Sequence, residues 1–367
     1  MKIIFIICLI FPMFSSTGHA VDIEERIFQE LEGNRILEEI PEELRYIFDD
    51  YNYITSDGLT HILQELKEQL ISGLKTEVSN AWRPAVKTLM IVLICGIIWS
   101  ISPEASSEFP ILFCGIAAIV FVCLGNSDSY FKQCVRIIAK TYDFATVLLP
   151  TLAAASVASG ATISSGVKYT AAVLFMNVIL NFSNTVLVPL IKMYVVCKIG
   201  DALFQQPILG VVSNVIRWGC ISALSTSVLI FTAYLKVAGI ITENGELLAT
   251  KITQTTLSNG LPVVGRIISD AASTLVAGAS TIRNGIGLLG MLVIISILLG
   301  PLISAGVRYF IFRLVGECSQ IYSNQRFKSV IAAIGDSYGM LFAIIGTDFI
   351  VLFLILLSFM QVTGGGL

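Results

Sequence analysis

The chain has 367 residues, of which 55% are hydrophobic and 13% are charged, and its formal net charge is −3. A soluble globular domain carries about 25% charged residues, so this composition excludes an ordinary soluble enzyme. The small net charge and the lack of a basic run exclude nucleic acid as a partner. The apolar excess instead predicts an all-α fold, a polytopic transmembrane helical bundle surrounded by membrane lipid.

Residues 1–20 have the pattern of a secretory signal peptide. Lys2 supplies the positive start, residues 3–14 form a short apolar core, and Gly18 and Ala20 are small residues at the positions that signal peptidase reads. The apolar core is too short to span a bilayer comfortably. We therefore predict cleavage after Ala20.

Residues 21–84 form the next unit, which we predict to be a small acidic helical region outside the cytoplasm. Thirteen of the chain's 26 acidic residues lie between Asp22 and Glu65. Apolar residues between Leu59 and Leu74 recur at helical spacing. Two interpretations of this region stay open, a solvated acidic face and a docking surface for partner proteins.

Residues 85–367 contain the apolar runs of a multispan membrane domain. Hydropathy predicts six or seven spans, because it does not settle broken segments. We expect a charged linker around Lys132, Arg136 and Lys140, and a re-entrant or buried helix over the weaker segment 260–278. The clear runs are Ala85–Ile101, Phe109–Gly125, Val147–Gly160, Val167–Val196, Gly219–Ile241, Gly285–Ala305 and Gly339–Met360.

The sequence gives two conflicting signals for orientation. A cleaved signal peptide places residues 21–84 outside, whereas Lys75, Arg83 and Lys87 flank the first span on that same side. The positive-inside rule argues for the opposite orientation. Because a signal peptide acts first and long segments translocate largely regardless of charge, we expect residues 21–84 to be outside.

Matching positions 112 residues apart predict an internal repeat, with copies near 149–241 and 261–361. Each copy would run from a Leu-Pro start, through a small-residue helix, to a long span ending at Pro-Leu-Ile. Repeated, proline-interrupted helices are typical of many transporters and channels, although chance similarity is the alternative. The matched pairs are Pro150 with Pro262, Pro189 with Pro301, and Gly166 with Gly278.

Two stretches rich in Gly, Ala and Ser, residues 153–165 and 271–280, allow helix backbones to approach closely. Two interpretations of these stretches stay open: tight helix packing alone, and the lining of a transport path or of a moving interface. We expect Asp270 and Arg283, which lie 13 residues apart, to be interfacial charges at the ends of one helix.

Asp348 lies near the middle of the apolar run 339–360. A carboxylate at such a position is costly unless it is paired, protonated or hydrated. We predict either a hydrogen bond between packed helices or a polar group that faces a cavity.

Cysteine and histidine usage argues against catalysis and metal binding. The eight cysteines show no CxxC pairing, and only His61 remains after the predicted cleavage. No phosphate-binding loop, nucleophile elbow or His-Glu-x-x-His motif occurs. We expect no cofactor, no metal site and no enzymatic activity.

Two segments carry the pattern of a known family. The first runs from Asp143 through Leu149-Pro150 to Gly160-Ala161, and the second from Leu261-Pro262 to Asn284-Gly285-Ile286-Gly287. With the signal peptide, the acidic head and the multispan body, they resemble the stage III sporulation protein AE family over nearly the whole chain. The positions of interest are Pro150, Gly160, Pro189, Pro262, Gly265, Asp270, Gly278, Asn284, Gly287 and Pro301.

The resemblance implies a membrane component of the channel complex between mother cell and forespore. It implies a location in the mother-cell membrane around the forespore and a role in forespore development after engulfment. The implied partners are other stage III A proteins, including a secretion-ATPase-like subunit and ring-forming proteins. A further implied partner lies in the forespore membrane, across the space between the two membranes.

Three functions compete at this point. The first is a structural or export-gate-like subunit of a multiprotein channel, which the resemblance favours. The second is a self-sufficient secondary transporter, which the repeat and Asp348 favour. The third is a membrane enzyme, for which the sequence offers no constellation of residues.

Overall fold

A computed structural model describes residues 56–101, 105–158, 162–260, 264–322 and 325–360, and all of them are helical apart from the short turn at 205–206. The all-α expectation is confirmed. The predicted signal peptide, most of the predicted acidic region and the last seven residues lie outside the described residues. The helices are α5 (Ser56–Ile101), α6 (Ala105–Ala158), α7 (Thr162–Phe182), the π-helix η2 (Ser183–Leu187), α8 (Val188–Phe204), α9 (Pro207–Gly260), α10 (Val264–Tyr322) and α11 (Gln325–Met360).

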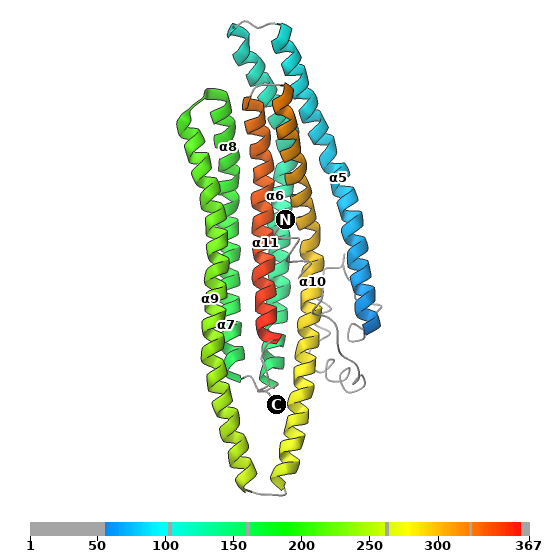
Figure 1. Ribbon diagram of the computed structural model, residues 1–367, viewed down its shortest axis with the longest axis vertical. Helices are drawn as coiled ribbons and strands as arrows, with labels where there is room; N and C mark the ends of the chain where they lie inside the picture. Colours follow the sequence, from blue (N-terminus) through cyan, green and yellow to red (C-terminus); the bar gives the residue numbers. More distant parts are fainter. Residues whose placement is uncertain (1–55, 102–104, 159–161, 261–263, 323–324, 361–367) are drawn as a thin grey trace.

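The helices run up and down along one long axis, and α11 lies in the middle of the bundle (Figure 1). It packs against α6, α7, α8, α9 and α10, whereas α5 lies at the periphery against α6 and α10. This explains why α11 is buried along its length, from Phe327 to Phe359. A polar side chain in the buried part of α11 must therefore find its partner within the bundle or remain without one.

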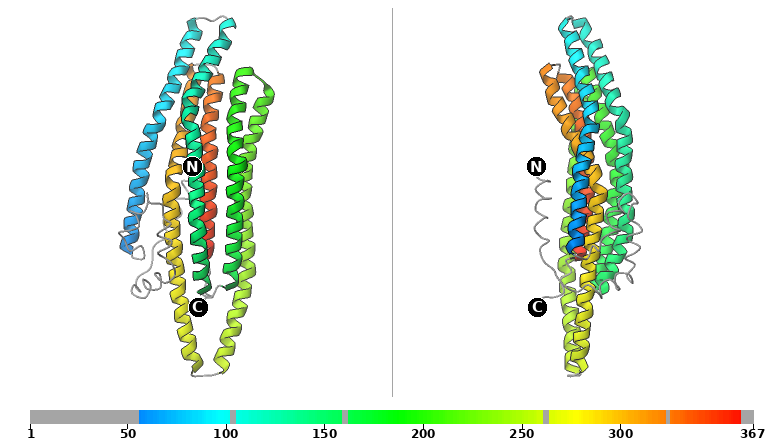
Figure 2. Two further views of the ribbon diagram at one scale, coloured as in Figure 1. Left: turned by 180° about the vertical axis from the view of Figure 1, so that it is seen from behind. Right: turned by 90° about the vertical axis from the view of Figure 1, so that its right-hand side faces the viewer.

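Two hairpins extend beyond the rest of the bundle, one at each end. The tip formed by α5 and α6 passes the turns that join α8 to α9 and α10 to α11 (Figures 1 and 2). At the opposite end, the last part of α9 and the first part of α10 run beyond the other helices. The weak segment 260–278 is thus mainly the beginning of α10 and is not a separate re-entrant helix.

Six of the described helical segments are long and apolar enough to cross a membrane. The prediction of a multispan bundle is confirmed, and the candidate spans among the described residues number six, the lower of the two expected counts. The run that begins at Phe109 forms only a shorter apolar segment, Phe109–Cys123. The six candidate spans are Gln64–Ile101, Tyr130–Ala158, Tyr169–Phe204, Pro207–Leu235, Asn284–Gln320 and Gln325–Met360.

The charged linker predicted around Lys132, Arg136 and Lys140 is wrong, because α6 is continuous through it. These three side chains recur every four residues and are all exposed, so they form one polar stripe on a helix. Similarly, α5 runs without interruption through the expected boundary between residues 84 and 85, with Pro84 inside it.

Glycine allows close packing between α10 and α11. A Cβ atom at Gly335 would lie 3.3 Å from Cβ of Phe312 and 3.4 Å from the backbone nitrogen of Arg313. A Cβ at Gly339 would lie 2.8 Å from the ring of Tyr309. Small residues at such interfaces allow backbones in a membrane to approach closely. This contact fixes the neighbouring residue of α11, Asp336, against α10.

The structure does not show the predicted internal repeat. Pro150 lies inside α6 and does not begin a helix, and Pro301 lies inside α10 and does not end a span. Pro189 falls in the first turn of α8, after which the span continues to Phe204. The connection that contains Pro262 lies outside the described residues.

Candidate functional site

The most connected polar group of the bundle is the carboxylate of Asp336 on α11. Tyr194 of α8 donates its hydroxyl hydrogen to Oδ2 of Asp336 over 3.1 Å. Arg217 of α9 lies 3.4 Å from Oδ2, and Arg313 of α10 lies 3.4 Å from Oδ1. One carboxylate therefore joins α8, α9, α10 and α11, and we call these four residues the Asp336 cluster.

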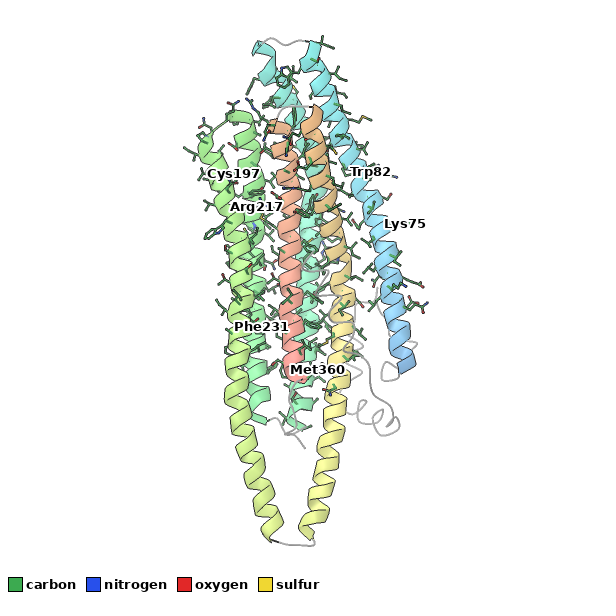
Figure 3. All side chains as sticks on the ribbon, in the orientation of Figure 1. Lys75, Trp82, Cys197, Arg217, Phe231 and Met360 are labelled. Carbon is green, nitrogen blue, oxygen red and sulfur yellow. The ribbon has the colours of Figure 1, made fainter. Side chains whose placement is uncertain are left out.

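The Asp336 cluster is buried at its centre and open at its edges. The side chain of Asp336 is 7% exposed, whereas the side chains of Arg217 and Arg313 are each 45% exposed. Arg217 lies on α9 towards the end at which α8 and α9 are joined (Figure 3). At 1.5 Å per residue, it is about 15 Å from that turn. The arginines can thus neutralise a buried carboxylate while their outer atoms reach a more polar layer.

A second polar contact attaches the peripheral helix α5 to α10. Glu77 of α5 accepts a hydrogen bond from the hydroxyl of Ser304 at 2.9 Å and lies 3.3 Å from the guanidinium of Arg308. Both charged side chains are about one-fifth exposed. The guanidinium carbon of Arg308 also lies 4.4 Å from the ring centre of Tyr130 on α6, a cation–π contact.

The third polar feature is Asp348, which is buried in α11 and faces a cavity of about 30 Å³. Its Oδ2 atom has no hydrogen-bond partner among the described residues. The cavity lies between α6, α7 and α11, and its walls are mostly apolar, with Thr141 and Tyr142 of α6 as the other polar residues among them. Of the two alternatives predicted for Asp348, the structure places it as a polar group that faces a cavity.

A helix irregularity lies close to this cavity. Between α7 and α8, Ser183–Leu187 form one turn of π-helix, and Val188 donates its N–H to the carbonyl of Ser183. Two side-chain oxygens in this turn, Oγ of Ser183 and Oδ1 of Asn184, are buried without a partner among the described residues. π-helical turns within helices are frequent at functional sites.

The residues predicted from the family pattern are not gathered into one place. Asn284 is exposed on α10, whereas Gly287 is buried and a Cβ added there would lie 2.7 Å from Met360. Gly265, Asp270 and Gly278 also belong to α10. Gly160 and Pro262 lie outside the described residues. The described motif positions are therefore spread over α6, α8 and α10.

The Asp336 cluster and the Glu77–Arg308 pair are not among the residues predicted from the sequence. Arg217 and Asp336 each lie two or three residues outside a predicted apolar run, because each run ends before a charged residue. Helical periodicity, continued past these charges, keeps both residues inside their spans. Nothing in the sequence, however, indicates that they meet.

The arrangement has the features of a multi-pass helical membrane protein. The charged groups of the Asp336 cluster are paired between helices, and six described segments are suited to cross a bilayer. Within the part of the chain that the structure describes, no group of three potential metal ligands occurs.

The family follows from comparison with known proteins. The model of the stage III sporulation protein AE family matches residues 49–364, and the chain belongs to this family. Stage III sporulation protein AE of Bacillus subtilis (strain 168) is 23% identical over 202 residues, which are 55% of this chain. The match covers 51% of that relative, about half its length. No solved structure matches the chain.

Proposed function

We propose that this chain is a membrane subunit of a channel or secretion-like complex that connects mother cell and forespore. The observation that carries the proposal is the family match over residues 49–364. The subunit has a structural or gating role and is not an enzyme. It is needed for development of the forespore after engulfment.

The proposed partners are other stage III A proteins, including a secretion-ATPase-like subunit and ring-forming proteins. The exposed apolar residues of the α5–α6 tip support assembly with other helices, because the tip extends beyond its own bundle. Ile97 and Ile101 of α5 and Phe109 and Phe113 of α6 are all exposed there. In a membrane, such surfaces contact either lipid or a partner helix.

The proposed location is the mother-cell membrane, with residues 21–55 and the C-terminus on its outer side. Because α6 is continuous, the positive stripe around Arg136 lies on a helix and not in an external loop. This removes one of the charged segments that set the positive-inside rule against the predicted signal peptide. Within 12 residues, five Lys or Arg residues flank residues 205–206 and 323–324, and three flank residues 159–161 and 261–263. Lys67 and Lys75, near the start of the first span, lie on the same side as the second set, so the two sides are equal by the positive-inside rule and the proposed orientation rests on the predicted signal peptide.

Co-purification tests the assembly directly. The full-length chain, tagged and expressed from its own locus, is extracted from sporulating cells in mild detergent after engulfment. We expect the other stage III A proteins to co-purify with it, and an unrelated multi-pass membrane protein with the same tag serves as the control. Recovery of the chain alone, under conditions that preserve known complexes, would argue against this function.

A second candidate function is a self-sufficient secondary transporter. Asp348 favours it, because an unpaired carboxylate within a span often marks an ion pathway. The purified chain in liposomes should then take up a solute in response to an ion gradient. The absence of such uptake would argue against the transporter and leave the channel-subunit function as the only candidate.

A further inference from the structure

We propose that the exposed face of α6 between Lys132 and Asp143 is a docking surface, within the membrane, for a transmembrane helix of another subunit that carries acidic side chains. We call this surface the α6 face. The proposal rests on the channel-subunit function only for the presence of other subunits, and it adds the place and the chemistry of one contact. The charged residues of the α6 face are Lys132, Arg136, Lys140 and Asp143, all of which are exposed.

The α6 face lies at the depth of the hydrocarbon core. Ile138 and Thr141, which lie on either side of Lys140 in the sequence, line the cavity that Asp348 faces. Asp348 lies near the middle of the apolar run 339–360. Lys140 is therefore near the middle of the membrane, about 15 Å from either edge of a hydrocarbon core about 30 Å thick. A lysine side chain is less than half that long and cannot reach either edge.

Contacts between α6 and α10 give the same depth. Tyr130 donates its hydroxyl hydrogen to the carbonyl of Pro301 over 3.3 Å. Leu148 lies against α10 at Gly290, where an added Cβ atom would overlap its side chain. Lys140 is nearly midway between these two contacts along α6, and the middle of the apolar run 285–305 lies between them on α10. Two neighbouring helices thus place Lys140 at mid-membrane.

The α6 face differs from the apolar surface of α9. Viewed from behind, α6 lies in front of α11 with its outer side towards the viewer (Figure 2). Lipid next to this side would meet Arg136, Lys140 and Asp143, and charges in hydrocarbon are costly even when neighbours on one helix pair with each other. Something other than lipid therefore covers the α6 face. On α9, by contrast, the exposed residues from 218 to 230 carry no charge: Trp218, Ile221, Ser225, Thr226, Leu229 and Ile230.

The sign of the charge indicates the chemistry of the covering helix. Lys192 of α8 is exposed beside the α6 face, with its Nζ atom 5.7 Å from the ring centre of Phe131. Even if Asp128, four residues before Lys132 in the sequence, is counted, bases outnumber acids by four to two. Positive charges in a membrane are stabilised when carboxylates pair with them. A partner helix with Asp or Glu four residues apart, about 6 Å along its axis, would match the spacing of the bases on α6.

A second copy of this chain is a poorer match for the α6 face. In a symmetric dimer the same surface meets itself, so positive charge would lie against positive charge. Like charges in contact disfavour association. A water-filled path is the other alternative, because water solvates charges without a partner. It requires that aqueous reagents reach Lys140, and the experiment measures this access.

Co-purification of the tagged full-length chain from sporulating cells tests the docking surface. The variant Arg136→Met/Lys140→Met replaces two exposed charges by unbranched apolar side chains. It should change little in the Tm of the purified chain or in its amount in the membrane. It should, however, lower the recovery of one other stage III A subunit about tenfold, because the acids of that subunit lose their partners. Lys75→Met removes an exposed lysine of α5 (Figure 3) and should change neither quantity.

Photo-cross-linking in the assembled complex identifies the occupant. With p-benzoylphenylalanine in place of Lys140, we expect a cross-link to the subunit that the double variant loses, in a transmembrane segment with Asp or Glu beside the linked position. The same amino acid in place of Trp218 on α9 should not link to that subunit. Lys140→Glu should lower the spore count, and a change of the partner's acid to Lys should restore it.

Each part of the test has a result that contradicts the proposal. Normal recovery of all subunits with Arg136→Met/Lys140→Met would overturn the docking surface and leave the channel-subunit function in place, as would a cross-linked segment without an acid. Labelling of Lys140→Cys by a membrane-impermeant thiol reagent as fast as Lys75→Cys, above the wild-type background, would replace docking by a water-filled path. Recovery of no other stage III A protein with the wild type would contradict the proposed function itself and the docking surface with it.

Discussion

The guanidinium of Arg313 on α10 lies 3.4 Å from the carboxylate of Asp336 on α11, directly beside a close contact of the two helices at Gly335. Gly335 brings the two backbones together at Phe312 and Arg313, and Asp336, the next residue of α11, forms an ion pair with Arg313. Packing and charge pairing therefore reinforce each other at one level of the bundle. The same carboxylate also binds Tyr194 and Arg217, so it is the point at which four helices are joined.

Replacement of Asp336 by Ala should destabilise the bundle by about 2 kcal/mol. The change leaves two arginines and a buried tyrosine hydroxyl without their acceptor, and the half-exposure of the arginines limits the loss. Thermal unfolding in detergent measures the effect. Glu317→Gln, which removes an exposed ion pair with Lys328, is the matched control and should change Tm little. Equal effects of the two variants would contradict the role given to Asp336.

Glu77 and Arg308 should be energetically coupled. Because both side chains are mostly buried between α5 and α10, a double-mutant cycle with Glu77→Gln and Arg308→Gln should give a coupling of about 1 kcal/mol. Glu77→Ala should have a larger effect than Glu77→Gln, since Ala also removes the acceptor for Ser304. Additive effects of the two single changes would show that the pair does not hold α5 in place.

Six spans predict that the two ends of the chain lie on the same side of the membrane. Compartment-specific reporters fused at residues 30 and 366 should both report the outer side. A reporter inserted at Gln206, in the turn between α8 and α9, should report the cytoplasm. Opposite locations for residues 30 and 366 would require an odd number of spans, as in the seven-span alternative.

The roles of Pro150 and Pro189 can be distinguished by mutation. Pro150 interrupts the hydrogen bonds of α6, and its exposed position tolerates a larger side chain, so Pro150→Leu should raise Tm. Pro189→Leu restores an N–H after the π-helical turn and should favour a regular helix there. If that turn is functional, Pro189→Leu lowers the spore count without lowering the amount of protein in the membrane. Normal sporulation with Pro189→Leu would show that the π-helical turn is dispensable.

The sequence was sufficient for the fold class because apolar runs of membrane length have few alternatives. It was insufficient for the continuity of α6, because hydropathy treats charged residues as the end of a span. Lys132, Arg136 and Lys140 interrupt the apolar composition, but their four-residue spacing keeps the helix amphipathic. Periodicity, considered together with hydropathy, would have predicted one helix.

The candidate sites were predictable only in part. Asp348 could be found because it is a lone acid inside a long apolar run, and its cavity position was one of two predicted alternatives. The Asp336 cluster could not be found, because its residues lie up to 142 positions apart and meet only through the packing of four helices. The internal repeat is not shown, because Pro150 lies inside α6 and because Pro189 and Pro301 lie inside spans that continue beyond them, where the repeat required each span to end.

The most direct test of the proposed function is a clean deletion of the gene, scored by growth rate and by the count of heat-resistant spores. The account predicts unchanged vegetative growth, a block in spore development after engulfment, and recovery of spores when the full-length chain is restored. A growth defect in rich medium, or a normal spore count, would contradict a sporulation channel subunit and favour the transporter function instead.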